Sequence, residues 1–125
     1  MTTAFADFAD LATWTPICSI ARLEVERGVA ALVDGIPVAI FRTFTGDVYA
    51  LDNVDPFSGA SVLSRGIVGT RGDVPTVASP MHKQAFDLRT GDCLDDPTMR
   101  VRAWAVRVRD GVVEIGEPLA VSVPA

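Results

Sequence analysis

The residues that could carry chemistry are concentrated in two short segments of the chain. His82, the only histidine, lies in Ser79-Pro80-Met81-His82-Lys83, which leads into the apolar segment Ala85–Leu88 and a turn at Gly91. A second segment, Asp55-Pro56-Phe57-Ser58-Gly59-Ala60, has a similar order of proline, aromatic residue and glycine. Two loops of this kind that face each other would form a clamp.

Neither a hydrolytic site nor a metal site is well supported by these residues. A nucleophile needs an adjacent base and a group that orients the base, but Ser79 has only His82 nearby in the sequence. A zinc or iron site needs several nitrogen or sulfur donors at close range, and Cys18 and Cys93 are far apart in the sequence. We therefore expect His82 to be a structural histidine held by hydrogen bonds, and both cysteines to be free, small apolar side chains.

The composition excludes several classes of function. The chain has 125 residues, a formal net charge of -5 and a pI near 4.6. Nucleic-acid binding needs a cluster of basic residues, so we expect no nucleic-acid partner. The longest apolar run, around 38–41, is too short to cross a membrane. The N-terminus lacks the pattern of a signal peptide, which favours a cytoplasmic protein.

The elements that must position the two loops are β-strands. Two-residue turn signals separate runs rich in valine, isoleucine and aromatic residues at Asp34-Gly35, Gly46-Asp47 and Asp110-Gly111. The predicted hairpin strands are 29–33 with 36–43, 36–45 with 48–51, and 101–109 with 112–115. No long segment has helical periodicity, so the predicted fold is all-β, a small antiparallel sandwich or barrel.

The remaining segments carry weaker signals. Pro16 makes residues 14–18 a predicted edge strand. The apolar side of 100–109 changes near Trp104, which predicts a bulge there, with the arginines of this strand in solvent. Residues 61–77 are predicted to be an irregular connection, because their glycines fit no phosphate-binding motif. For residues 1–13 a short amphipathic helix and an irregular extension fit equally well, and 14–125 is predicted to be one domain.

The two loops resemble the cluster-binding loops of Rieske-type iron–sulfur domains. In that family the first loop reads Cys-Pro-His and then Gly-Ala, and the second reads Cys-Pro-x-His before a Phe-Asp strand; two cysteines and two histidines bind the [2Fe–2S] cluster. Three of the four ligand positions differ here, as Asp55, Phe57 and Ser79, and only His82 matches. The resemblance implies a Rieske-type fold of about ten short strands without the cluster, in which Phe57 fills the vacated space.

A Rieske-like chain of this size without the ligands resembles the small subunit of assimilatory NAD(P)H-dependent nitrite reductase. The resemblance covers residues 14 to about 116 and is most specific in 53–60, 62–69 and 79–83. It implies a chain with no active site and no cofactor of its own. Its partner would be a large subunit that carries FAD, siroheme and an iron–sulfur cluster and reduces nitrite to ammonium.

The tip formed by the two loops is the expected contact with that partner. The proposed contact residues are Pro56, Phe57, Ser58, Pro80, Met81 and Lys83. Alternatively, Phe57 and Met81 only close the tip of the domain itself. Two further functions stay open at this point: a Rieske ferredoxin that carries electrons to an oxygenase, and a freestanding binding domain on the same scaffold.

Overall fold

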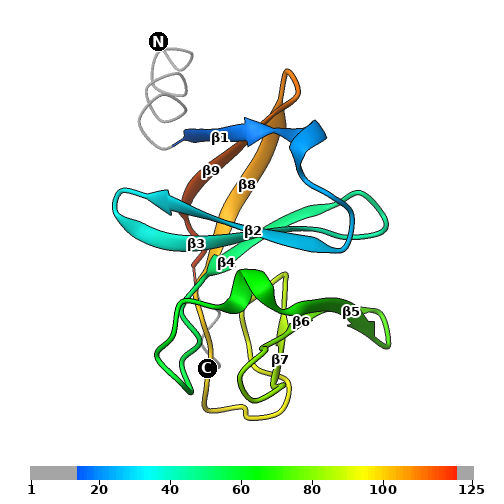
Figure 1. Cartoon of the computed structure of the whole chain (residues 1–125), viewed down its shortest axis with the longest axis vertical. Helices are drawn as coiled ribbons and strands as arrows, with labels where there is room; N and C mark the ends of the chain where they lie inside the picture. Colours follow the sequence, from blue (N-terminus) through cyan, green and yellow to red (C-terminus); the bar gives the residue numbers. More distant parts are fainter. Residues whose placement is uncertain (1–13, 121–125) are drawn as a thin grey trace.

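The computed structural model describes residues 14–120, which form two antiparallel sheets (Figure 1). The larger sheet has the strand order β1-β9-β8-β4-β3-β2, and the smaller has the order β5-β6-β7. The strands are β1 (Thr15–Ser19), β2 (Arg27–Val33), β3 (Ile36–Arg42), β4 (Val48–Asp52), β5 (Ile67–Arg71), β6 (Val74–Ala78), β7 (Ala85–Asp87), β8 (Ala103–Arg109) and β9 (Val112–Pro118). Two short 3-10 helices complete the elements, η1 (Ile20–Arg22) and η2 (Leu63–Arg65). The all-β prediction is confirmed.

Two of the three predicted hairpin turns have the expected geometry. Both residues of Asp34-Gly35 have positive φ, 52° and 80°, and so do both residues of Asp110-Gly111, at 53° and 76°. This matches the twist of the flanking strands. The third turn is longer than the two residues predicted, because β3 ends at Arg42 and β4 begins at Val48. Residues 43–47 form the connection, which the backbone N–H of Thr43 closes by donating to the Asp47 carbonyl over 2.9 Å.

Strand β3 is the centre of the molecule, because its two faces enter two different cores. Val38 and Ile40 pack in a cluster enclosed by the larger sheet, together with Trp104 of β8. Ala39 and Phe41 point the opposite way, into the cluster that joins the larger sheet to the smaller one. Successive side chains of a strand alternate between faces, so burial on both sides explains the continuous apolar run.

The edge strand and the bulge are also confirmed. β1, with Pro16, is an edge of the larger sheet and pairs only with β9. The pairing of β8 with β9 shifts register between Trp104 and Val106. The prediction that the arginines here lie in solvent is wrong for Arg107. Its guanidinium lies over the Trp14 ring and pairs with the Glu114 carboxylate at 2.6 Å, because Arg107 is opposite Glu114 in the β8–β9 pairing and Trp14 directly precedes β1, which pairs with β9.

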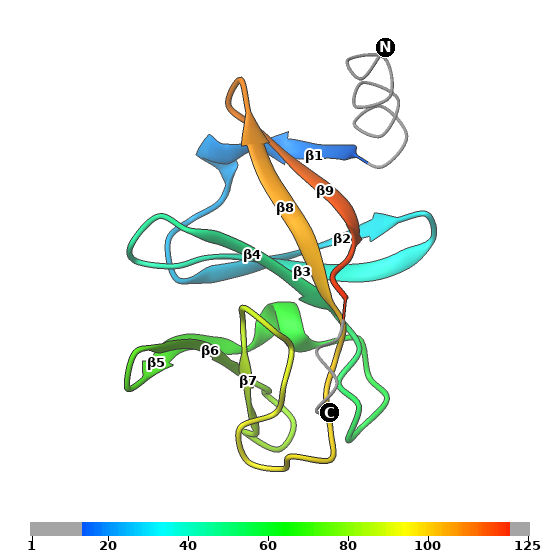
Figure 2. The same ribbon diagram turned by 180° about the vertical axis from the view of Figure 1, so that it is seen from behind.

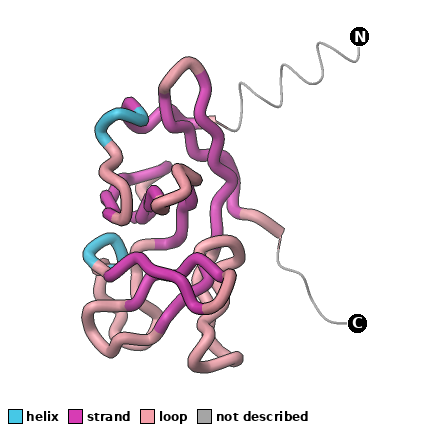
Figure 3. Tube along the Cα trace, turned by 90° about the vertical axis from the view of Figure 1, so that its right-hand side faces the viewer, coloured by secondary structure: helices cyan, strands magenta, loops and turns pink. Residues whose placement is uncertain are grey.

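The prediction of an irregular connection over residues 61–77 is wrong. This segment contains η2, β5 and most of β6, and β6 pairs with both β5 and β7. One of the glycines that suggested a loop serves close packing instead, since a Cβ at Gly66 would lie 2.4 Å from the Ala78 carbonyl oxygen, and Gly72 has positive φ in the turn between β5 and β6. Figure 3 shows that loop segments gather in the half of the molecule that holds this small sheet. The fold thus places both predicted loops at one end.

The alternatives for residues 1–13 lie outside the described residues. Among residues 14–120, no helix has the length and apolar character needed to cross a membrane.

Candidate functional site: two loops joined by a buried hydrogen bond

The first loop, residues 53–60, follows β4 and is closed by backbone hydrogen bonds. The Asp55 N–H donates to the Ala60 carbonyl over 2.8 Å, and the Gly59 N–H donates back to the Asp55 carbonyl over 2.7 Å. Gly59 has a φ of 75°, a conformation that glycine adopts without strain. The Asp55 carboxylate also accepts a bond of 2.8 Å from the Phe57 N–H. The carboxylate is thereby fixed inside its own loop.

The second loop, residues 79–84, connects β6 to β7 and repeats this arrangement. The Ser79 N–H donates to the Gln84 carbonyl, and the Lys83 N–H donates back to the Ser79 carbonyl, each over 2.9 Å. Lys83 has the same relation to Ser79 that Gly59 has to Asp55, and its φ is also positive, at 65°. The two loops are therefore two copies of one turn. In the second copy a lysine occupies the position where glycine is favoured.

The two loops meet through a side-chain hydrogen bond between the first residue of each turn. The Ser79 hydroxyl donates to the Asp55 carboxylate. Both residues are enclosed, with Asp55 0% and Ser79 1% exposed. A buried carboxylate that lacked partners would be costly, whereas this one accepts a bond from each loop. The residues that stand at the two cysteine positions of the Rieske pattern are thus hydrogen-bonded to each other.

Phe57, in the first loop, packs its ring against the core of the domain. It is half-buried and packs against the core shared by the two sheets. Its ring centroid lies 6.3 Å from that of Phe86 in β7, with an interplanar angle of 56°. This tilted arrangement is typical of favourable aromatic pairs. The side chain points into the domain, as expected if it replaces a ligand with apolar contact.

The outer face of the tip is formed mainly by the second loop. Pro80, Met81, His82 and Lys83 are all exposed, and Met81 keeps 50% of its surface in solvent. His82 was predicted to be held by hydrogen bonds, but its side chain makes none with the described residues. The reason is that the turn is closed by the Lys83 backbone and the Ser79 side chain, which leaves the imidazole directed outward.

The side chains present do not fit a [2Fe–2S] cluster. A cluster of the Rieske type needs two thiolates on one iron and two imidazoles on the other. The tip has one imidazole, a hydroxyl and a carboxylate already bound to each other, and a phenyl ring without a donor atom. Both cysteines are free; Cys93 is buried in the core and Cys18 lies on β1. Within residues 14–120 no three His, Cys, Asp or Glu side chains form a metal-binding group.

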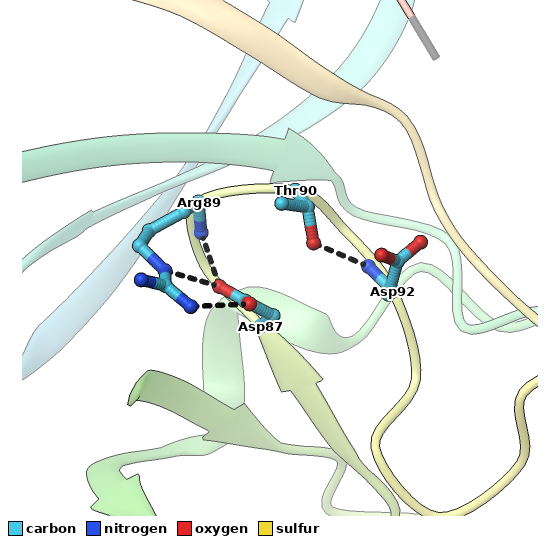
Figure 4. Close-up of polar contacts among 4 residues, drawn as sticks. All are labelled: Asp87, Arg89, Thr90 and Asp92. Carbon is cyan, nitrogen blue, oxygen red and sulfur yellow. Dashed lines mark hydrogen bonds and ion pairs between the residues drawn. The ribbon is translucent and has the colours of Figure 1, made fainter. Parts of the chain in front are cut away.

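The turn after β7 is held by hydrogen bonds to the side chains of Asp87 and Thr90 (Figure 4). The Asp87 carboxylate accepts hydrogen bonds from the backbone N–H of Arg89 at 2.8 Å and from its guanidinium at 3.0 and 3.1 Å. These bonds raise the pKa of Arg89 above its usual value. The Thr90 hydroxyl accepts from the Asp92 N–H over 3.2 Å and continues the turn. Asp87 thus holds both the backbone and the side chain of Arg89, two positions further along the chain.

Comparison with known proteins agrees with this geometry. Residues 13–116 match the model of the Rieske-like [2Fe-2S] domain family. The nitrite reductase (NADH) small subunit of Escherichia coli K12 is 42% identical over 106 residues, which cover 84% of this chain and 98% of that protein. A Mycobacterium tuberculosis crystal structure, provisionally described as an NADH-dependent nitrite reductase small subunit, superposes with a TM-score of 0.81. It is 49% identical, and the match covers 86% of this chain and 96% of the other.

A third relative is a much longer protein. The nitrite reductase [NAD(P)H] large subunit of Klebsiella oxytoca is 43% identical over 103 residues, which cover 82% of this chain but 11% of that protein. The same domain is therefore also found inside a large-subunit polypeptide. The chain belongs to the Rieske-like domain family and, within it, to the nitrite reductase small subunits.

Proposed function

We propose that this chain is the non-catalytic small subunit of a cytoplasmic NAD(P)H-dependent nitrite reductase, in which it supports the large subunit that reduces nitrite to ammonium. The match to nearly the full length of the E. coli small subunit carries this proposal. The Klebsiella large subunit adds support, because there one polypeptide contains the domain together with the rest of a large subunit. FAD, siroheme and an iron–sulfur cluster would belong to that partner.

The donor set disfavours the ferredoxin alternative. An electron carrier of the Rieske type needs the four cluster ligands, and the Asp55 and Ser79 side chains are engaged with each other instead. The freestanding binding domain differs from our proposal in needing no partner. It would predict ligand binding by the chain alone.

We further propose that the tip formed by 55–58 and 79–83 contacts the large subunit. The exposed apolar surface of Met81 beside Pro80 supports this, because exposed apolar loops at one end of a rigid scaffold are typical of recognition surfaces. Phe57 contributes from below by shaping the loop, since its ring packs inward.

Co-expression of the chain with its large subunit tests the function. We expect the two to co-purify, and nitrite-dependent NAD(P)H oxidation to fall when the small chain is omitted. Equal activity without the chain, together with no co-purification, would refute the proposal.

The tip contact is tested by Met81→Asp, a substitution at an exposed site. Leu119→Asp is the matched control, because Leu119 is similarly exposed and lies near the end of the described chain. We expect Met81→Asp to weaken capture of the large subunit by about tenfold and Leu119→Asp to leave it unchanged. Equal capture by both folded variants would exclude the tip.

A further inference from the structure

A groove on the side of the molecule, away from the two loops, has no role in the function proposed so far. Its first hollow, about 430 Å³, is lined by the β3–β4 connection, Tyr49 of β4, and the β5–β6 hairpin. Figures 1 and 2 show this connection and this hairpin projecting on the same side of the molecule. A second hollow, about 480 Å³, shares Glu26 and Val68 with the first and continues along β2 and β5. We refer to the two hollows together as the side groove.

Acidic residues predominate among the charged residues of the first hollow. Glu26, Asp47 and Asp73 place three carboxylates on its wall. Its one lining cation is Arg89, whose guanidinium is already held by the Asp87 carboxylate through two hydrogen bonds. The carboxylates on the wall therefore outnumber the cation. An incoming ammonium or guanidinium group would be attracted by this excess of negative charge.

Aromatic side chains add a second reason to expect a cation there. Phe44, at the β3–β4 connection, keeps 65% of its surface exposed and lines this hollow. Tyr49 is half-buried in the same wall, and burial together with the nearby Asp47 carboxylate raises the pKa of its hydroxyl. The phenol stays protonated at neutral pH. Aromatic faces beside carboxylates are a favourable setting for lysine or arginine side chains.

The other end of the side groove has an excess of positive charge. Arg27 and Arg65 line the second hollow beside Ile67, and they outnumber the shared Glu26. Ile67, on the outer strand of the smaller sheet, is 78% exposed. Arg27 lies 3.8 Å from the Glu24 carboxylate, and both side chains are mostly in solvent, so this ion pair holds it weakly. The side groove thus runs from an acidic hollow, past exposed apolar residues, to a basic hollow.

We propose that the side groove binds an extended segment of a protein partner that carries a lysine or arginine, an apolar residue and then an acidic residue. This rests on the proposed function, in which the partner is the large subunit. Two connected hollows of opposite charge fit a chain segment better than a single small cation, which would use only one of them. The ends of this chain outside the described residues, 1–13 and 121–125, contain no lysine or arginine and cannot supply such a side chain to the acidic hollow.

Charge reversal at each end of the groove tests this proposal. Asp73→Lys replaces a carboxylate of the acidic hollow by an ammonium group. Glu117→Lys makes the same replacement at an exposed site outside the groove and is its control. Arg65→Glu changes the basic hollow, and Arg109→Glu is its control on β8. We expect each groove variant to raise the Kd for the large subunit about tenfold at low salt and less at high salt. The controls should stay within about twofold of wild type.

The outcomes separate this inference from the proposed function. If wild type binds the large subunit and all four variants bind equally well, the groove is not the contact and the function stands. If wild type does not bind at all, the proposed function fails and the inference fails with it. Sedimentation velocity of the chain alone gives the third outcome. A self-association that Asp73→Lys abolishes would assign the groove to a second copy of this chain and overturn the inference.

Discussion

The hydrogen bond between the Ser79 hydroxyl and the Asp55 carboxylate gives the sharpest prediction. Ser79→Ala removes the one donor that the second loop supplies to this buried carboxylate. Hydrogen bonds to charged groups contribute about 1.5–3 kcal/mol, and the loss leaves a carboxylate oxygen buried without that partner. We therefore expect a loss of about 2–3 kcal/mol in the free energy of unfolding. For a chain of this length that corresponds to a fall in Tm of roughly 10 °C.

Urea unfolding at pH 7 measures this loss, and a second serine provides the control. Ser58 lies in the first loop, where its exposed hydroxyl accepts a bond of 3.2 Å from the Ala60 N–H. Ser58→Ala should cost no more than about 0.5 kcal/mol. Unchanged m-values would show that the variants unfold from equally compact native states.

A double-mutant cycle with Asp55→Asn isolates the link between the loops. The two residues share one buried bond, so the substitutions should couple by about 1–2 kcal/mol, and the double variant should be less unstable than the sum of the single variants. Additive losses, or a Ser79→Ala cost equal to that of Ser58→Ala, would refute the reasoning that this bond holds the tip together.

Three further predictions follow from other contacts. The pKa of Asp95 lies below its usual value, first because its carboxylate accepts from the Ala85 N–H and then because of Arg71. The Asp95 carboxylate therefore contributes stability above its unfolded pKa, near 3.8, and this contribution is lost as the pH falls below that value. Asp95→Asn should remove the effect and flatten the profile of Tm against pH between about 5 and 2.5. Gly91→Ala should cost more than 3 kcal/mol in urea unfolding, because φ is +84° and the new Cβ would lie 2.0 Å from the Val101 carbonyl oxygen. Gly72→Ala, with φ +63° and open space around it, should cost only about 1–2 kcal/mol. The triple variant Asp55→Cys, Phe57→His, Ser79→Cys should acquire visible absorption and about two iron atoms per chain on anaerobic reconstitution; a colourless, folded triple variant would show that the loops have lost more than their donor atoms.

The sequence predicted the sheet elements well where turn chemistry is local. Asp34-Gly35 and Asp110-Gly111 need positive φ at both positions, and these residues tolerate it, so both hairpins could be located. The length of the connection at 43–47 was underestimated, because β3 ends before it and the Thr43 N–H bonds to the Asp47 carbonyl across it. The strands of 67–78 were missed because their glycines and proline suggested a loop, although each pairs with the next strand along the chain, β5 with β6 and β6 with β7.

The two loops were identified from sequence, but the hydrogen bond between them was not. Asp55 and Ser79 were recognised only as positions where a cysteine would stand in the related family. Those two cysteines bind the same iron, so an acceptor and a donor at these positions are placed to meet. That signal was present in the residue types. The side groove had no such signal, because Phe44, Asp73 and Arg65 come from segments that only the packing of the two sheets brings together.

The link between the two loops also bears on how this protein matures. A domain whose loops are joined through an iron–sulfur cluster reaches its final stability only after the cluster is assembled, and it depends on iron supply and on protection from oxidants. A hydroxyl bound to a carboxylate needs neither an inserted cofactor nor a particular redox state. The tip of this chain can therefore form as soon as the polypeptide folds. It should keep its shape through iron limitation and oxidative stress.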